Sequence, residues 1–138
     1  MAGSANRVVA IVVGILFVLL GVVGFFVTAP AGFVDTTGVL LLGVFSLNGL
    51  YNVVHILIGA ALVIAALAGA RPAKTTNQVI GTACLVLGLA GLFVVGSPFN
   101  VLAINGADNV VHFGSAAVLL TVGLGAERPS RAGAAERG

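Results

Sequence analysis

The sequence predicts an all-α membrane protein with four transmembrane helices, built from two parallel helix–loop–helix repeats. Three observations predict this class: a composition that is 59% hydrophobic and only 7% charged, four long apolar segments, and a motif that occurs twice. Soluble domains carry about 25% charged residues, so an ordinary soluble globule is excluded. Disorder is also excluded, because disordered chains combine low hydrophobicity with high net charge.

Four segments are long and apolar enough to cross a membrane. A hydrocarbon core about 30 Å thick requires about 20 helical residues, and no Lys or Arg lies within any of these segments. All four prolines follow a segment by two to four residues, where a proline ends a helix without breaking its interior. The predicted spans are residues 8–28, 50–69, 78–96 and 108–125.

The basic residues predict the orientation. Arg7 precedes the first span, Arg71 and Lys74 lie between the second and third, and three arginines follow the fourth. The other two connections, residues 29–49 and 97–107, contain no Lys or Arg. Because cytoplasmic segments carry the basic residues, we expect a multi-pass protein of the bacterial inner (plasma) membrane with both termini in the cytoplasm.

The motif Asn-Gly-x-x-Asn-Val-Val-His occurs at residues 48–55 and again at 105–112, an offset of 57 residues. Three glycines of the first span recur in the third span at an offset of 67 residues. Such internal similarity predicts parallel repeats related by a pseudo-two-fold axis along the membrane normal. The single domain, residues 1–138, then divides into repeat one (about 7–70), repeat two (about 77–126) and a cytoplasmic tail (127–138).

The connection before the first motif is unusually apolar. From residue 38 to residue 69 the apolar tract is too long for one crossing. We therefore predict a short interfacial or re-entrant helix over residues 38–47, with a strongly tilted long helix as the alternative. Residues 98–103 are expected to form a shorter version of the same element.

Each motif carries a polar stripe, defined as its two asparagines and its histidine. These residues occupy relative positions 0, 4 and 7, which share one helix face. Either the helix begins at the Asn-Gly pair, or the first Asn lies in the capping loop and only the other two lie inside. Polar groups facing lipid are costly, so both stripes should face the bundle interior. The candidate polar site comprises Asn48, Asn52, His55, Asn105, Asn109 and His112.

Three interpretations of the stripes remain open. They form a hydrogen-bonded knot between the second and fourth spans, or they place His55 and His112 as axial ligands of a haem, or they line a small polar vestibule for a solute or ion. A metal site is disfavoured, because Asp108 is the only nearby carboxylate. Asp108 itself is predicted to cap its helix, and Tyr51 is assigned to an aromatic belt.

No pattern in the chain predicts catalysis. There is no catalytic-triad context, phosphate-binding loop or dinucleotide-binding fingerprint, and no basic cluster that would bind nucleic acid. We expect a small integral membrane protein without enzymatic activity, serving as a structural or accessory subunit that associates with itself or with a larger membrane complex. The alternatives are a haem-binding redox accessory protein and a transport component that binds a small solute or ion. No cofactor is expected beyond the haem alternative.

Four stretches of the chain carry a resemblance to a known family. They are Gly24-Phe25-Phe26 with Thr28, Phe45-Ser-Leu-Asn48, Asn52-Val-Val-His55-Ile-Leu-Ile-Gly59, and Asp108-Asn109-Val-Val-His112. Together they resemble a bacterial family common in actinobacteria and called domain of unknown function 4383. The resemblance covers roughly residues 6–125. It implies a four-helix membrane protein and implies no particular activity.

Overall fold

The computed structural model describes residues 4–125, which form four helices and one β-hairpin. Each helix is long and apolar enough to cross a membrane. The all-α class is therefore confirmed, and the architecture is that of a multi-pass membrane protein. The helices are α1 (Ala5–Thr28), α2 (Gly49–Ala68), α3 (Ala70–Val94) and α4 (Gly106–Leu124).

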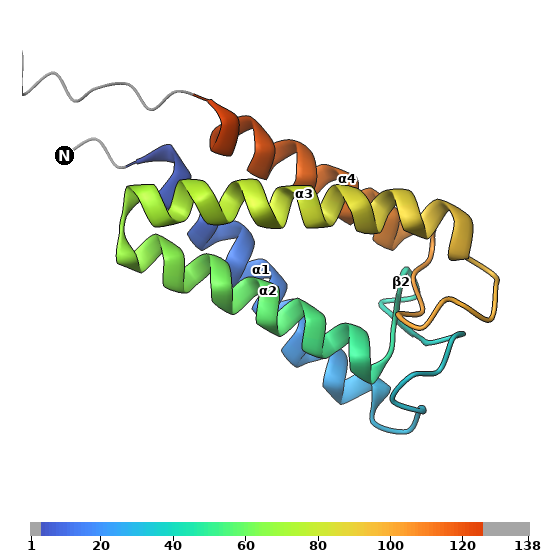
Figure 1. Cartoon of the computed structure of the whole chain (residues 1–138). Coiled ribbons are helices and arrows are strands. Elements are labelled where there is room, and N and C mark those ends of the chain that lie inside the picture. The colour runs from blue at the N-terminus through green and yellow to red at the C-terminus, as the bar shows by residue number, and fades with distance from the viewer. Residues whose placement is uncertain (1–3, 126–138) are drawn as a thin grey trace, which may run out of the picture.

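The helices form two pairs. α1 packs along α2 and α3 packs along α4, and these contacts are far more extensive than those between the pairs. The pairs meet where Gly69 joins α2 to α3, and they diverge toward the opposite end (Figure 1). We call the end at Gly69 the basic end, since Arg7, Arg71 and Lys74 lie there, and the opposite end, with residues 29–48 and 95–105, the loop end.

Glycines let the backbones of paired helices approach closely. A Cβ atom on Gly59 of α2 would lie 2.5 Å from the carbonyl oxygen of Gly14 and 2.7 Å from the backbone nitrogen of Val18, both in α1. In the second pair, a Cβ on Gly81 would instead meet the side chain of Leu120 at 2.9 Å. The α1–α2 contact is thus backbone against backbone, whereas this part of the α3–α4 contact is backbone against side chain.

The burial pattern is the reverse of a soluble protein's. Large apolar side chains such as Leu16, Leu57 and Val86 are exposed, while asparagines, histidines and small residues fill the interior. In water so much exposed apolar surface would be unfavourable. In a membrane it faces hydrocarbon, and the polar side chains gain by lying inside.

The third helix begins earlier than predicted. α3 starts at Ala70 rather than at residue 78, so the expected loop around Arg71 and Lys74 is helical. Pro72 therefore lies inside α3, and not in a loop between α2 and α3. It is tolerated because it occupies the first turn, where backbone N–H groups have no helical partner. The break between the helices comes from Gly69, whose φ of 138° is open to glycine.

The prediction of a helix over residues 38–47 is wrong. This segment forms an antiparallel hairpin of β1 (Val39–Leu41) and β2 (Phe45–Leu47), with Leu41 opposite Phe45. Residues at the start of the hairpin and in its turn adopt positive φ values, which a right-handed helix does not allow: Gly38 (65°), Leu42 (55°) and Gly43 (70°). The apolar run therefore forms a hairpin that covers the loop end. It forms neither a tilted membrane crossing nor an interfacial helix.

The second connection differs as well. Residues 98–103 form consecutive turns instead of a short helix, and Asn100 organises them by exchanging side-chain hydrogen bonds with the backbone of Ile104. Pro30 and Pro98 follow the ends of α1 and α3, as predicted. The predicted tail, residues 127–138, lies outside the described residues.

Candidate functional site

The first asparagine of each motif caps its helix. The Oδ1 atom of Asn48 accepts a hydrogen bond from the backbone N–H of Tyr51 at 2.8 Å, and that of Asn105 accepts one from Asp108 at 3.0 Å. N-cap side chains satisfy backbone donors that have no helical partner. Of the two placements considered from the sequence, the one with the first Asn in the capping position is therefore confirmed.

The amide nitrogens of these two caps cross between the helix pairs. Asn48 Nδ2 donates to the carbonyl oxygen of Val101 at 2.8 Å, and Asn105 Nδ2 donates to that of Val44 at 2.7 Å. The two acceptors are 57 residues apart, as are the two donors. Asn48 Nδ2 also donates to the carbonyl of Asp35 at 2.9 Å. Each loop is thus held by the cap of the opposite pair.

The second asparagine of each motif packs onto a glycine of the neighbouring helix. A Cβ on Gly24 would collide with Asn52 Oδ1, and a Cβ on Gly91 would collide with Asn109 Oδ1. Neither oxygen meets an N–H or O–H donor within residues 4–125, and each packs directly against the Cα of its glycine. The Nδ2 atom of Asn52 donates to Thr28 Oγ1 at 2.8 Å. This contact gives a reason for the recurrence of the two glycines: each lies opposite the second asparagine of the motif in its own helix pair.

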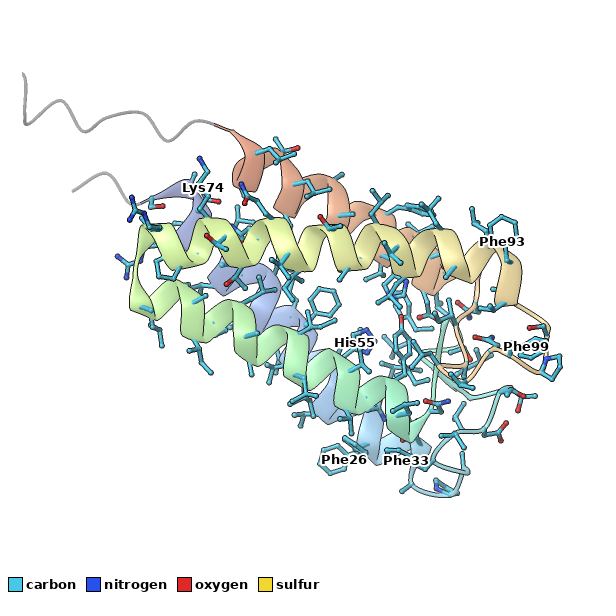
Figure 2. The ribbon with its side chains drawn as sticks, in the orientation of Figure 1. Phe26, Phe33, His55, Lys74, Phe93 and Phe99 are labelled. Atoms are coloured by element: carbon cyan, nitrogen blue, oxygen red, sulfur yellow. The ribbon has the colours of Figure 1, made fainter. Side chains whose placement is uncertain are left out.

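The histidines meet around Tyr51, in the interior between the helix pairs. The Tyr51 hydroxyl shares a 2.7 Å hydrogen bond with His112 Nε2, and its ring lies 4.1 Å from the ring of His55, centroid to centroid. Phe17 also stacks on the ring of His55, at 5.3 Å from centroid to centroid. All four side chains are buried, and Figure 2 shows His55 directed from α2 into the space between the pairs.

Tyr51 is the residue that sequence reasoning misplaced. The aromatic-belt assignment is wrong for it, because its side chain is buried and bonded across the bundle. One signal could have found it: Tyr51 stands four residues before His55 and so shares the stripe's helix face.

His55 is the least satisfied member of the cluster. Neither of its ring nitrogens has a hydrogen-bond partner within the described residues. The two histidines are therefore not equivalent, although their motifs are identical.

Asp108 caps α4, as predicted, and its carboxyl group also binds strand β2. Its Oδ2 atom accepts hydrogen bonds from the backbone N–H of Asn105 at 2.9 Å and of Ser46 at 3.2 Å. The first completes a reciprocal capping box. The second ties strand β2 to the start of α4, so this buried carboxyl group joins the hairpin of one half to the helix of the other.

The haem alternative is not supported by this geometry. Bis-histidine ligation needs a ring nitrogen of each histidine directed at an iron between them. Instead, the Tyr51 ring packs on His55 and its hydroxyl bonds to His112 Nε2. Within residues 4–125, no group of three or more His, Cys, Asp or Glu side chains is placed to hold a metal ion.

A cavity of about 520 Å³ opens at the loop end between the two connections. Of the stripe residues, only Asn105 lines it, so the stripes and the cavity are largely separate. No charged side chain is among its lining residues. The polar side chains that line it are Thr36, Thr37, Ser46, Ser97, Asn100 and Asn105.

Nearby, Asp35 organises the first connection. It accepts hydrogen bonds from the backbone N–H of Thr37 at 2.9 Å and from the Thr37 hydroxyl at 2.7 Å. These bonds, the backbone one first, lower the pKa of the partly exposed Asp35 carboxyl below its usual 3.8. The carboxylate of Asp35 therefore remains ionised at neutral pH.

At the basic end, cations cap helix C-termini. Arg7 Nε donates to the carbonyl oxygen of Ala66 at 2.7 Å, and Lys74 Nζ donates to that of Gly125 at 2.9 Å. Positive charge is favourable at a helix C-terminus. Arg7 and Lys74 are 67 residues apart, the offset of the matched glycines. This role was not anticipated from the sequence.

Replacing Tyr51 with phenylalanine tests the central hydrogen bond. The ring packing is kept, but the buried His112 Nε2 loses its partner, which costs about 1–3 kcal/mol. We expect the free energy of unfolding in mixed micelles to fall by that amount. The control is Phe17→Leu, which changes packing on His55 without touching the bond. An unchanged unfolding free energy for Tyr51→Phe would show that the bond contributes nothing.

Fold and site together define a small four-helix, multi-pass membrane protein with a polar, internally bonded loop end. The chain belongs to the family described as domain of unknown function (DUF4383), whose model matches residues 7–125. No curated protein and no solved structure matches the chain.

Proposed function

We propose that the chain is a structural or accessory protein of the bacterial inner membrane, without catalytic activity of its own, which associates with itself or with a larger membrane complex. One observation carries the proposal: the side chains of the polar stripes make their contacts inside the protein. Four of the six candidate residues make side-chain hydrogen bonds that cap helices, cross between pairs or join neighbouring helices, Asn109 packs on Gly91, and His55 makes ring contacts alone. This pattern favours the hydrogen-bonded knot over a ligand site.

The proposal includes two parallel repeats related by a pseudo-two-fold axis along the membrane normal. Two pairs of contacts support it, each repeated at the offsets of the sequence: the crossed bonds of Asn48 and Asn105, and the asparagine–glycine contacts. Arg7 and Lys74 also cap the ends of corresponding helices, although the carbonyls that they bind, of Ala66 and Gly125, lie 59 residues apart. The symmetry is imperfect where Tyr51 and Asp108 occupy matching positions, since one bonds a histidine and the other caps a helix.

The hydrogen-bonded knot and the association of the protein are tested separately. His112→Ala should lower thermal stability while leaving the oligomeric state of the remaining folded protein unchanged. Cross-linking in native membranes, followed by sizing in mild detergent, should yield a homo-oligomer or a larger complex. A dispersed monomer under both conditions contradicts the accessory role but leaves the knot untouched.

The proposed orientation places the basic end in the cytoplasm. With Cys84 replaced by alanine, Lys74→Cys should resist an impermeant thiol reagent added to intact cells, whereas Asp35→Cys should react. Both positions should react in permeabilised cells, which controls for accessibility. Labelling at position 74 from outside would reverse the topology.

The cavity at the loop end favours a second candidate, a component that binds a small solute. Its lining combines uncharged hydroxyl and amide groups with apolar side chains such as Val95 and Ile104, which suits a neutral molecule with polar and apolar faces. Sugars, polyols and small amides should then raise the melting temperature. Thr36→Leu, which fills the cavity, should abolish this rise, whereas Thr36→Ser should keep it. No rise with any solute would remove this candidate.

A further inference from the structure

The tips of both loops carry exposed apolar side chains. Leu42 is 84% exposed and Phe99 is 79% exposed, and the two are 57 residues apart, the offset of the two motifs. Val44 and Val101, a second pair at this offset, are each about half exposed. Figure 2 shows Phe99 pointing away from the bundle at the loop end. Both halves therefore present apolar groups at matching positions.

Leu42 occupies its position at a conformational cost. It has a φ of 55° and is followed by Gly43 at 70°, in a turn closed by a 3.1 Å bond from Val44 N–H to the Leu41 carbonyl. Turn positions with positive φ favour Gly, Asn and Asp, because a bulky side chain crowds the backbone there. A leucine does not help the turn form, which indicates that its side chain acts outside the fold.

The backbone beside each tip is held in place. The carbonyl groups of Val44 and Val101 accept the crossed hydrogen bonds from Asn105 and Asn48. Each tip is therefore supported by the opposite half of the molecule. Ordered loops of this kind present their apolar groups in a fixed direction and do not fold them inward.

The tips continue the lipid-facing surface of the helices. Phe26 and Phe93, near the ends of α1 and α3, are also strongly exposed and lie 67 residues apart. Residues 29–48 and 95–105 contain no Lys or Arg and only one acidic residue, Asp35. The headgroup layer extends about 5–7 Å beyond the hydrocarbon on each side. Loops that start at the helix ends and carry so little charge can lie within that layer.

We propose that Leu42 and Phe99 insert into the headgroup–acyl boundary of the membrane leaflet at the loop end and anchor both loops to the bilayer. The partner is the lipid surface itself, in the manner of apolar side chains on interfacial segments. The inference requires that the helices span the membrane. It does not depend on the accessory role, or on which side of the membrane the loop end faces.

The chain contains no tryptophan, so single substitutions report their own surroundings. Leu42→Trp and Phe99→Trp are reconstituted in phosphatidylcholine–phosphatidylglycerol vesicles. We expect blue-shifted emission, protection from iodide, and stronger quenching by lipids brominated near the carbonyl than by lipids brominated near the chain end. Leu16→Trp, halfway along α1, is the deep reference, and Thr37→Trp, on the turn beside Asp35, is the polar reference.

Two results would overturn the proposal. Water-like emission quenched by iodide would place the tips in solvent. Blue-shifted emission that no brominated lipid quenches would place them against protein, either a second copy or another chain. Circular dichroism confirms that each variant keeps its helices. Should Leu42→Trp or Phe99→Trp fail to fold, Val44→Trp and Val101→Trp give the same readout beside each tip.

Discussion

Replacing Gly59 with alanine is expected to lower the free energy of unfolding by about 2–3 kcal/mol, the upper range for overpacking a close contact. The added Cβ would lie 2.5 Å from the Gly14 carbonyl oxygen and 2.7 Å from the Val18 backbone nitrogen. Both neighbours are backbone atoms of a regular helix, so no side-chain rotation can relieve the contact. α1 and α2 must move apart, which also disturbs Asn52 packed between them.

The control for this substitution is Gly114→Ala in α4. A Cβ there has open space around it, and alanine is favoured over glycine inside a helix by about 1 kcal/mol. Unfolding in mixed micelles with increasing dodecyl sulfate, followed by circular dichroism, should show Gly59→Ala shifted to lower detergent fractions and Gly114→Ala unchanged or higher. Equal effects of the two would mean that the close approach of α1 and α2 does not limit stability.

Position 59 also shows how far the two halves differ. Its counterpart at the repeat offset is Ala116, which is buried in the second pair. The α3–α4 contact therefore accommodates the methyl group that the α1–α2 contact excludes. Ala116→Gly should accordingly cost the helix propensity of alanine, about 1 kcal/mol, together with about 0.8 kcal/mol for the loss of one buried methyl group.

Replacing Asn48 with alanine is the second substitution expected to have a large effect. Asn48 is fully buried and makes three hydrogen bonds, to Tyr51 N–H and to the carbonyls of Asp35 and Val101. Loss of the N-cap alone costs about 1 kcal/mol, and two partly buried carbonyls, of Asp35 and Val101, lose their donor. We expect a total loss of about 2–4 kcal/mol, with both loops released from the cap.

Asn48→Ser separates the two contributions. Serine can still cap α2 but cannot reach the two carbonyls, so it should recover about 1 kcal/mol. Asn105→Ala is the matched substitution in the other half, and should cost less because the amide nitrogen of Asn105 donates one hydrogen bond, to Val44, whereas that of Asn48 donates two. Hydrogen exchange of the loop amides measures the release directly. Full rescue by serine would show that the crossed bonds do not stabilise the protein.

Much of the fold follows from local sequence. Four spans are predictable because each apolar run has the length of a membrane crossing, and the ends of α1 and α3 follow from Pro30 and Pro98. The start of α3 was mispredicted because Pro72 marks a helix boundary in sequence, yet a proline fits equally well before a helix or in its first turn. Only the backbone at Gly69 distinguishes the two cases.

The hairpin could not be predicted from periodicity. Val39-Leu-Leu-Leu-Gly-Val-Phe45 has no alternation of polar and apolar residues, and short apolar runs fit strand and helix alike. The hairpin is held by contacts with the other half of the chain: Asp108 accepts a hydrogen bond from Ser46 in β2, and Asn105 Nδ2 donates one to the carbonyl oxygen of Val44. Those partners lie about 60 residues away in the chain, beyond any local signal.

The sequence by itself determined the membrane class, the count of four helices, the capping role of Asp108 and the six residues of the polar stripes, because hydrophobicity and helical spacing are local properties. The tertiary structure decided what those residues do. It showed that the side chains of Asn48 and Asn105 each donate a hydrogen bond to the loop of the opposite helix pair. It also showed that Tyr51 contacts both histidines, although their motifs are identical. It also left the ring nitrogens of His55 without a hydrogen-bond partner among the described residues. These outcomes depend on which side chains meet across the bundle, and that follows only from how the two helix pairs pack.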